Sequence, residues 1–276
     1  MRIAVLKGGD SLERGVSLRS AARVELALAE LGHETVAVEP GPRLVGRLRH
    51  ERPDLAFVAL RAGGEDGTVQ ELLEILEIPI TGSPAGACAR CADRIFAKHE
   101  LRAAGVPTPD WFALRETAFR EFGAADALGE LEQKLGFPLV IKPSHGGSAL
   151  GVEVVDSWFE VPEALISAFG YDERVLLERF AAGAELKLSL LGGEVLGGAE
   201  TAAGGVAGAA YKALGCAGFA RVTLIDAADG PLAIEVDPAP DLSEAGELSR
   251  AAETAGIGFV RLIERIVELA LNPAAR

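Results

Sequence analysis

The sequence predicts an α/β protein built from several small sub-domains. In the first 60 residues, three short apolar runs of strand-forming residues alternate with two segments that have helical spacing of apolar residues. Alternation of this kind is typical of a parallel sheet with helices on both faces. The chain has 276 residues, of which 49% are hydrophobic. This length predicts two or three sub-domains around one ligand rather than one simple core.

The N-terminal part is predicted to form a parallel sheet with two loops at its ligand-binding edge. The expected elements are the strands Arg2–Leu6, Glu34–Val38 and Leu55–Leu60 and the helices Val16–Leu31 and Arg43–His50. Ligands of such sheets bind beyond the carboxyl ends of the strands. The loops Gly8–Arg14 and Arg61–Gly67 lie there, and both combine glycine with acidic residues. Each loop is expected either to hold an amine or simply to turn the chain.

The middle of the chain begins with two helices and an extended connector. The helices are expected at Ser83–Cys91 and Asp93–Ala104, after a short strand at Pro79–Thr81. Gly105–Pro109, with the sequence GVPTP, predicts an extended connector because a proline disfavours helical backbone at the residue before it. From Asp110 to about Phe180, strands and helices are expected to alternate again.

The stretch Leu139–Val152 is the part of this region that is expected to bind phosphate. An apolar strand leads to Lys142, a proline ends the strand, and the glycines Gly146, Gly147 and Gly151 follow. Glycines let backbone N–H groups approach an anion closely, and a lysine adds a point charge. The stretch is not a P-loop, and it leads into a strand rather than into the helix of a Rossmann turn. The alternative is a hairpin loop that needs glycine only for its bend.

The C-terminal part is predicted to hold further strands and two closing helices. The expected strands are Val175–Phe180, Glu185–Leu191, Arg221–Ile225 and Leu232–Val236, with the last two joined by the turn Asp226–Gly230. The segment Gly192–Gly208 consists mostly of Gly, Ala and Val, so it has almost no polar side chain that could reach a ligand. Apolar spacing predicts helices at Ser243–Ala255 and Phe259–Leu271.

Charge, hydropathy and cysteine content exclude several classes of protein. The net charge of −14 argues against nucleic-acid binding, which requires a basic face. No apolar run is long enough to span a membrane, and no signal-peptide pattern precedes the first strand, so we expect a cytoplasmic protein without membrane contact. Cys88 and Cys91 have C-x-x-C spacing, but no second pair completes a zinc site. Together with Cys216, they are expected to be buried or half-buried thiols.

Six regions of the sequence match the motifs of one family in the same order. They are GGDSLERGVSLRS (Gly8–Ser20), GGEDGTVQELLE (Gly63–Glu74), TGSPAGACARCADRIFAK, KPSHGGSALGV, LLERFAAGAEL (Leu176–Leu186), and finally LGCAGFARVTLI with AIEVDPAP. They resemble the D-alanine–D-alanine ligase family of ATP-grasp enzymes. The resemblance implies an ATP-grasp fold with three α/β sub-domains around a central nucleotide cleft. We expect them at residues 1–83 (N-terminal parallel sheet), 84–180 (central ATP-grasp part) and 181–276 (C-terminal ATP-grasp part).

The chemistry implied by this resemblance is ATP-dependent carboxylate–amine ligation, a step of peptidoglycan biosynthesis. One substrate carboxylate attacks the γ-phosphate of ATP to give an acylphosphate and ADP, and the amine of a second amino acid then displaces phosphate. The expected partners are therefore ATP and amino acids, with two Mg²⁺ (or Mn²⁺) ions bridging the phosphates. Members of the family commonly form homodimers, and the Ala-rich helix around Ala85–Ala92 is expected to pack against the partner.

The resemblance also assigns roles to individual residues. The catalytic residues are Glu13, which would hold the first ammonium group, Ser148 in the loop that stabilises the transferring group, and Arg221, which would steady the phosphate or acyl intermediate. The nucleotide-binding residues are Arg94, Lys142, Gly147, Ser148, Glu178, Arg179, Phe180 and Glu185, and the metal ligands are Glu235 and Asp237. For Glu13, the alternative is that it only caps the following helix.

Several positions depart from the family pattern, mostly where the acceptor would bind. Arg61 stands in place of a histidine, Arg94 of a lysine, Thr223 of a metal-binding acid, Asp237 of an asparagine, Asp241 of an oxyanion-hole glycine and Gly246 of a serine. The lid loop of the family is expected to be cut to Thr201–Ala210. Asp241 is either a carboxylate facing the oxyanion or only a solvated turn residue. The chain is accordingly expected to be a shortened, diverged ligase with altered or weakened activity, or an inactive member that binds nucleotide or serves in assembly.

Overall fold

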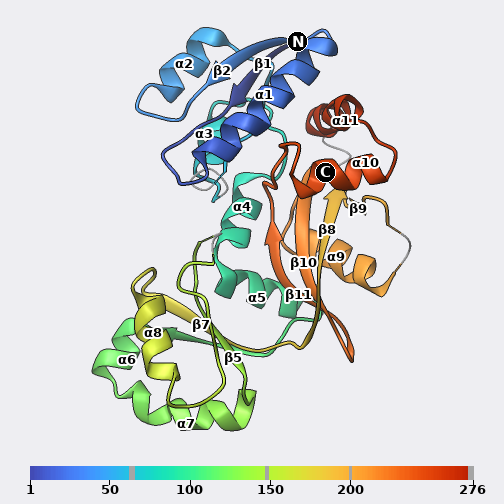
Figure 1. The fold of residues 1–276 in the computed structure, drawn as a ribbon. Coiled ribbons are helices and arrows are strands. Elements are labelled where there is room, and N and C mark those ends of the chain that lie inside the picture. Colours follow the sequence, from blue (N-terminus) through green and yellow to red (C-terminus); the bar gives the residue numbers. More distant parts are fainter. Residues whose placement is uncertain (62–65, 147–148, 199–200, 273–276) are drawn as a thin grey trace.

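The computed structural model describes residues 1–61, 66–146, 149–198 and 201–272, and these ranges contain three separate sheets (Figure 1). Their strand orders are β2-β1-β3, β4-β7-β5-β6 and β11-β10-β8-β9. The mixed α/β architecture predicted from the sequence is therefore confirmed. The strands of the three sheets fall within residues 2–58, 111–179 and 183–237 in turn. The sub-domain boundaries near Ser83 and Phe180 stay predictions.

The first sheet is parallel and has helices on both faces, as the strand–helix alternation predicts. It consists of β1 (Arg2–Leu6), β2 (Glu34–Val38) and β3 (Leu55–Val58), with α1 (Arg14–Glu30), α2 (Leu44–Glu51) and α3 (Thr68–Ile75) in the connections. Alternate residues of β1 pack on opposite sides, because successive side chains of a strand point to opposite faces. Ile3 and Val5 join the core under α1, whereas Ala4 and Leu6 join the core beneath α2 and α3.

The end of the chain returns to this first sheet. The helices α10 (Glu247–Thr254) and α11 (Phe259–Leu271) pack with α1 against the same face, and Figure 1 shows α11 beside α1. The guanidinium of Arg23 on α1 lies 3.8 Å from the ring centroid of Phe259. It also donates to the carbonyl of Leu242 (3.0 Å) and to Ser249 Oγ (3.2 Å). The C-terminal segment therefore fixes the first sheet to the rest of the molecule.

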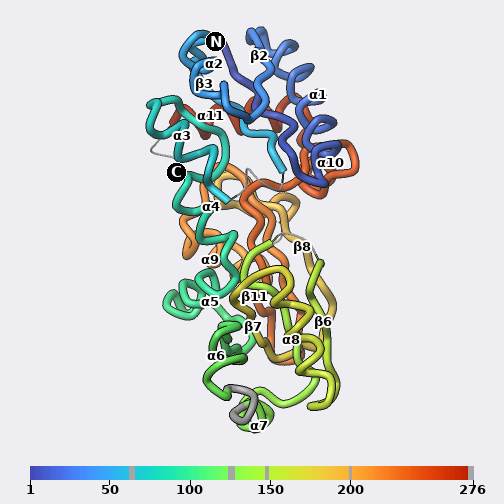
Figure 2. The backbone as a smooth tube through the Cα atoms, turned by 90° about the vertical axis from the view of Figure 1, so that its left-hand side faces the viewer, coloured from blue at the N-terminus to red at the C-terminus, as the bar shows by residue number. Residues whose placement is uncertain are grey.

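The second and third sheets are antiparallel. The second contains β4 (Trp111–Arg115), β5 (Leu139–Pro143), β6 (Glu153–Val155) and β7 (Arg174–Arg179), and α6 (Glu116–Glu121), α7 (Ala124–Leu135) and α8 (Val161–Phe169) lie with it. The third contains β8 (Gly183–Leu191), β9 (Glu194–Val195), β10 (Phe219–Ala227) and β11 (Gly230–Asp237). One face of the third sheet packs against α9 (Ala202–Ala213), and α4 (Ala85–Ala92) and α5 (Arg94–Ala103) contribute Cys91 and Leu101 to the same core (Figure 2). Residues on the second and third sheets, such as Val140 and Ile225, line a pocket that is described below.

The prediction that Thr201–Ala210 is the remnant of a lid loop is wrong. Thr201 is the N-cap of α9, and its Oγ1 accepts the N–H of Gly204 at 3.0 Å. Ala207, Ala210 and Tyr211 of this helix are buried against the third sheet. Small residues allow the helix to approach the sheet closely, and this tertiary packing offsets the low helix propensity of its glycines. Only residues 196–201 connect β9 with α9.

Helix α4 has one buried and one exposed side. Ala85, Ala87, Cys88 and Cys91 are buried within the chain, whereas the small residues Gly86 and Ala89 are exposed. The expected contact of this helix with a partner subunit stays a prediction. The three cysteines are free and buried, as predicted, but Cys91 lies beside Cys216 (Sγ–Sγ 3.7 Å) rather than paired with Cys88. Burial raises the pKa of Cys88 to about 12, so it is a neutral thiol. Within the described ranges, no helix has the length and apolar content needed to cross a bilayer.

Candidate nucleotide and metal site

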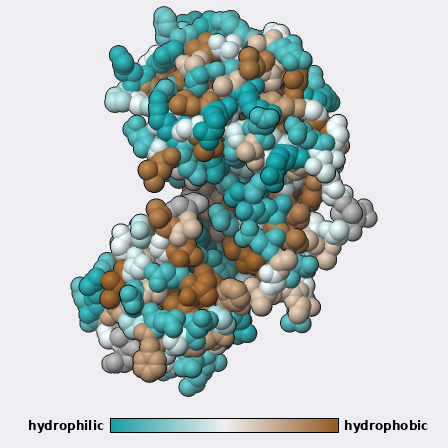
Figure 3. Space-filling model, viewed as in Figure 1, coloured by the Kyte–Doolittle hydropathy of each residue, from teal (hydrophilic) through white to brown (hydrophobic). Residues whose placement is uncertain are grey.

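A pocket of about 350 Å³ lies between the second and third sheets. Val140 and Val152 line it on one side, and Ile225 and Ile234 of the third sheet line it on the other. Figure 3 shows the molecule hollowed between the lower part, which carries the second sheet, and the rest. Two aliphatic walls of this kind suit a flat ring whose faces are apolar and whose edge forms hydrogen bonds.

The pocket brings together most of the residues that sequence analysis assigns to nucleotide and metal. The predicted residues that line it are Arg94, Lys142, Glu178, Arg179, Phe180, Glu185 and Glu235. They come from α5, β5, β7, β8, β11 and the connection between β7 and β8. The other three that the structure describes, Glu13, Arg221 and Asp237, form a separate group described below. Gly147 and Ser148 lie outside the described residues.

At the end of β7 and just after it, two backbone N–H groups form hydrogen bonds within the protein. The N–H groups of Arg179 and Phe180 donate to the carbonyls of Asp110 (2.9 Å) and Pro138 (3.1 Å). These two donors are therefore engaged, and Ala181, the next residue, also lines the pocket. Hydrogen bonds to the edge of a ligand ring must therefore come from the remaining backbone groups of the connection between β7 and β8, or from the side chains around it.

A buried cluster of one carboxylate and two ammonium groups lies at the pocket, and two of its members, Glu178 and Lys142, line it. Glu178 on β7 bonds Lys142 Nζ through Oε2 and Lys98 Nζ through Oε1. The side chains of Glu178 and Lys98 are each only 2% exposed. Burial alone would raise the pKa of Glu178, but the charges of Lys142 and Lys98 outweigh it and lower that pKa. Burial lowers the pKa of Lys98 to about 8 although Glu178 opposes the shift.

Arg94 and its neighbour Asp93 hold the start of the glycine-rich stretch. Arg94 donates to the carbonyls of Pro143 (2.8 Å), His145 (3.4 Å) and Gly146. Asp93 caps α5 by accepting the N–H groups of two residues in its first turn, and its Oδ1 also accepts Ser144 Oγ–H at 2.7 Å. Asp93 and Arg94 therefore attach the loop after β5 to the start of α5. Arg94 is positioned by these carbonyls while it faces the pocket.

Arg61, which replaces the histidine of the family pattern, joins three distant segments. Its Nε lies 3.2 Å from Glu13 Oε2 at the start of α1, and its Nη1 lies 3.0 Å from Asp237 Oδ2 at the end of β11. The same Nη1 donates to the carbonyl of Ala239. Glu13 occupies the N-cap position of α1, but its side chain makes no capping hydrogen bond. The structure thus assigns the Glu13 carboxylate to an ion pair and not to a helix cap.

Arg221 extends this network across the third sheet. Its guanidinium lies 3.3 Å from Asp237 Oδ2 and 2.7 Å from Glu247 Oε2. Lys187 on β8 pairs with the other oxygen of Glu247 at 3.3 Å. Burial alone would lower the pKa of Arg221, but Asp237 and Glu247 raise it. Among the described residues, the cations Arg61, Lys187 and Arg221 are therefore each paired with carboxylates, which are Glu13, Asp237, Glu247 and, for Lys187, also Glu185.

The two predicted metal ligands differ in whether their carboxylate oxygens are already engaged by other groups of the protein. Asp237 Oδ2 faces the two guanidinium groups, and Oδ1 accepts the N–H of Ala239 at 2.9 Å. Glu235 lines the pocket, directly across from Thr223 in the β10–β11 register. Among the residues that the structure describes, no three His, Cys, Asp or Glu side chains are grouped to hold a metal. Glu235 fits a Mg²⁺ ion that takes most of its ligands from phosphate and water, which is a common arrangement for this ion.

Asp241 has a structural role in the fold. Its Oδ1 accepts Ser20 Oγ–H (2.8 Å) and the N–H of Ser243 (2.7 Å), and its Oδ2 accepts Ser243 Oγ–H (2.7 Å). It is thus neither a solvated turn residue nor a free carboxylate. At Gly246, a Cβ would lie 2.2 Å from the Asp241 carbonyl, so the serine of the family pattern would require the backbone to move.

Sequence reasoning missed Lys98, Arg61 as a binding residue, and Glu247. A signal for Lys98 is present in the sequence, since Ile95, Lys98 and Leu101 are spaced by three and all three are buried on one face of α5. A lysine in an apolar helix stripe needs a buried acid partner. Nothing local indicates the partners of Arg61 and Glu247, because Asp237 and Arg221 are distant in the sequence.

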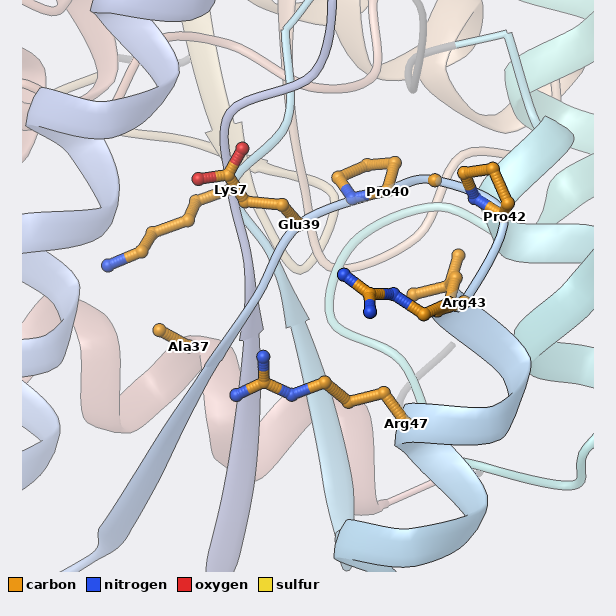
Figure 4. A pocket seen from close by; sticks show the side chains of 9 residues that line it. Lys7, Ala37, Glu39, Pro40, Pro42, Arg43 and Arg47 are labelled. Atoms are coloured by element: carbon orange, nitrogen blue, oxygen red, sulfur yellow. The ribbon is translucent and has the colours of Figure 1, made fainter.

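A second pocket of about 440 Å³ lies at the carboxyl ends of β1 and β2 (Figure 4). Figure 4 shows Arg47 of α2 and Arg43, the residue just before this helix, extending toward the strand that carries Ala37. Lys7 in this pocket is paired with Glu25 at 2.7 Å. None of the residues assigned by sequence analysis lines it, so the pocket between the second and third sheets is the candidate site.

Comparisons with known proteins agree with this assignment. The family model described as "D-ala D-ala ligase C-terminus" matches residues 101–204 and 198–268, two segments that overlap at residues 198–204. A D-alanine–D-alanine ligase of Moorella thermoacetica is 36% identical over 310 aligned positions, which cover 99% of this chain and all of the relative. One of a Synechococcus species is 34% identical over 100% of this chain and 95% of the relative.

Solved structures show the same likeness. The D-alanine–D-alanine ligase of Bacillus anthracis superposes with a TM-score of 0.88 and 31% identity, covering 98% of this chain and 97% of that one. The complex of that ligase with ATP gives a TM-score of 0.85 and 32% identity over the same shares. The fold is that of the ATP-grasp ligases. By its identity to full-length relatives, the chain belongs to the D-alanine–D-alanine ligase family, a family of enzymes.

Proposed function

We propose that this chain is an ATP-dependent ligase that joins two D-amino acids through an acylphosphate. The proposal rests on one observation above all: seven residues predicted for nucleotide and metal line one pocket between the second and third sheets. The ATP complex of the Bacillus anthracis ligase supports the choice of nucleotide. The family assignment supports a cytoplasmic role in peptidoglycan biosynthesis.

In this proposal, ATP binds along the pocket from its apolar walls to its charged end. Adenine lies between the aliphatic walls. The exposed carboxylate of Glu185 accepts hydrogen bonds from the ribose hydroxyl groups, and the ammonium group of Lys142 neutralises phosphate oxygens. The glycine-rich stretch after β5 covers the phosphates, with Gly147 and Ser148 supplying amides to the transferring group. Arg94 holds that stretch through the carbonyls of Pro143, His145 and Gly146.

The acceptor substrates bind beyond the phosphates, beside Glu13, Arg61 and Arg221. A carboxylate substrate pairs with a guanidinium there, and Glu13 accepts its ammonium group. Positioning is the main contribution of these residues, because phosphoryl transfer needs an attacking oxygen held in line with the leaving oxygen. A Mg²⁺ or Mn²⁺ ion held by Glu235 and the phosphates would supply further neutralisation of the transferring group.

We further propose that turnover is slow. Thr223 contributes no charge where the family pattern has an acid, and the two guanidinium groups beside Asp237, those of Arg61 and Arg221, are already paired with carboxylates. The charge that develops on the transferring group therefore meets little surplus positive charge from the protein, and a single missing stabilising group costs about 10²–10³ in rate. The same network favours the alternative of a nucleotide-binding protein without turnover, since it ties the acceptor residues to one another.

The two alternatives differ in product formation. ATP, Mg²⁺ or Mn²⁺, and D-alanine alone or with other D- and L-amino acids are incubated with the protein, and ADP and dipeptide are quantified by a coupled assay and by mass spectrometry. We expect dipeptide from at least one D-amino acid pair, at a low rate with D-alanine. ADP release without dipeptide from any pair would contradict the ligase proposal. Rapid D-alanyl-D-alanine formation would contradict only the proposed slow turnover.

We also propose a homodimer, on the basis of the family assignment. One side of α4 is buried within the chain, so a partner can meet this helix only on its other side, where Gly86 and Ala89 are exposed. Sedimentation velocity at micromolar concentrations should show a species of twice the chain mass. A monomer throughout this range would contradict the proposal.

A further inference from the structure

Lys98 lies behind the nucleotide pocket and has no surface in it. It is 1% exposed, whereas Lys142 and Glu178 line the pocket. Its Nζ bonds Glu178 Oε1 on β7 and donates to Thr108 Oγ1 at 2.5 Å in the connector before β4. Thr108 in turn donates to the carbonyl of Ala233 on β11 at 2.7 Å. The ammonium group is therefore fixed by both sheets that enclose the pocket.

Glu178 joins this fixed cation to the cation that faces the ligand. Its Oε1 bonds Lys98, and its Oε2 bonds Lys142. A phosphate placed in the pocket competes with Glu178 for Lys142, because one ammonium group has three donors to share among its acceptors. If Lys142 were its only partner, Glu178 would become a buried carboxylate without a cation whenever Lys142 turned to phosphate, which is strongly unfavourable.

We propose that Lys98 is a positioning residue for the nucleotide: it keeps Glu178 paired, so that Lys142 is free to bind phosphate. The inference rests on the proposed nucleotide site and adds to it a residue that does not touch the ligand. Lys98 acts only on the phosphate part of the nucleotide, since its effect passes through Lys142. Its loss should leave the binding of an unphosphorylated nucleoside unchanged.

The test compares ADP with adenosine by calorimetry. Lys98→Met should weaken ADP binding about tenfold, which is the effect of one charged hydrogen bond, and should change adenosine binding little. Lys212→Met, which removes an exposed lysine at the end of α9, is the matched control and should change neither affinity. In the double variant Lys98→Met/Glu178→Gln, no carboxylate holds Lys142, so ADP affinity should be higher than in Lys98→Met alone.

The pH profile gives a second readout. Burial lowers the pKa of Lys98 to about 8, and the charged groups around it are Glu178 on β7, Lys142 on β5 and Arg102 on its own helix. As pH rises through 8, Lys98 loses its charge. Lys142 is then the only charged partner of Glu178 in this cluster, so it stays paired with Glu178 and is less available to phosphate. The ADP affinity of the wild type should therefore fall relative to that of adenosine between pH 7 and 9.5, whereas that of Lys98→Met should not.

Three results would overturn the inference. The first is wild-type ADP affinity in Lys98→Met. The second is an equal loss of adenosine and ADP binding in that variant, which would indicate a general disturbance of the pocket. The third is a double variant that binds ADP no better than the single variant. If the wild type bound neither ligand, the proposed nucleotide site would fail together with the inference.

Discussion

Replacing Glu178 with alanine should lower the free energy of unfolding by about 3–5 kcal/mol at pH 7, which is the usual cost of breaking a buried ion pair from one side. The variant leaves the Lys98 and Lys142 ammonium groups next to each other, with side chains only 2% and 9% exposed. Denaturant unfolding followed by tryptophan fluorescence is a suitable measurement, because Trp111 on β4 pairs directly with Glu178.

The pH dependence of this loss identifies its cause. Burial already lowers the pKa of Lys98 to about 8 in the presence of Glu178, and removal of the carboxylate lowers it further below the usual 10.5. The unfolded variant then binds more protons than the folded one in this range, so its stability rises with pH. Wild-type stability rises in the same way only above the Lys98 pKa of about 8, so the deficit relative to the wild type should narrow mainly between pH 7 and 8. Glu185→Ala, at a carboxylate that is 57% exposed, should change stability by no more than about 0.5 kcal/mol. A similar loss in both variants would contradict the role of the buried cluster.

Lys142→Ala should weaken ADP binding by about 10- to 100-fold and leave adenosine binding largely intact. The side chain lines the pocket and carries the ammonium group that we assign to phosphate, and a hydrogen bond to a charged group contributes about 1.5–3 kcal/mol. The fold should tolerate this change better than the loss of Glu178, since Glu178 keeps Lys98 as a partner. Calorimetric titrations with the two ligands measure the difference.

If Lys142 binds phosphate, Lys142→Ala weakens ADP binding but not adenosine binding. If the substitution disturbs the whole pocket, it weakens both. Lys212→Ala provides a control in which one exposed lysine that does not line the pocket is removed, and it should bind both ligands as the wild type does. Equal weakening of adenosine and ADP by Lys142→Ala would show that Lys142 shapes the pocket instead of binding phosphate.

The first sheet could be predicted from the sequence because its signals are local. The strands at Arg2–Leu6, Glu34–Val38 and Leu55–Val58 are short apolar runs between segments with helical periodicity, and the structure places them side by side in parallel. Most of helix α9 was not predicted, since its glycines and alanines carry no helical pattern of apolar residues. Its structure depends on packing against the third sheet, which local sequence does not reveal.

The candidate site could be predicted only where its residues lie in short local motifs. Lys142, Glu178 and Glu185 lie in short motifs that resemble those of the family, and the pocket brings them together. The partners of Arg61 and Lys98 come from other segments of the chain, so the charge of these residues alone does not indicate what they bind. Ion pairs between segments distant in the sequence require the fold to be known. In the same way, the sequence shows that Asp237 is acidic but not that two guanidinium groups already face it.

A crystal structure of the protein with Mg²⁺ and a non-hydrolysable ATP analogue is the most direct test of the proposed site. We predict the purine ring between Val140 and Val152 on one side and Ile225 and Ile234 on the other, with phosphate oxygens bound to Lys142 Nζ. We also predict that Lys98 still contacts Glu178 in this complex. A nucleotide bound elsewhere, for example in the pocket beside Arg43 and Arg47, would contradict the account, as would no bound nucleotide at millimolar concentration.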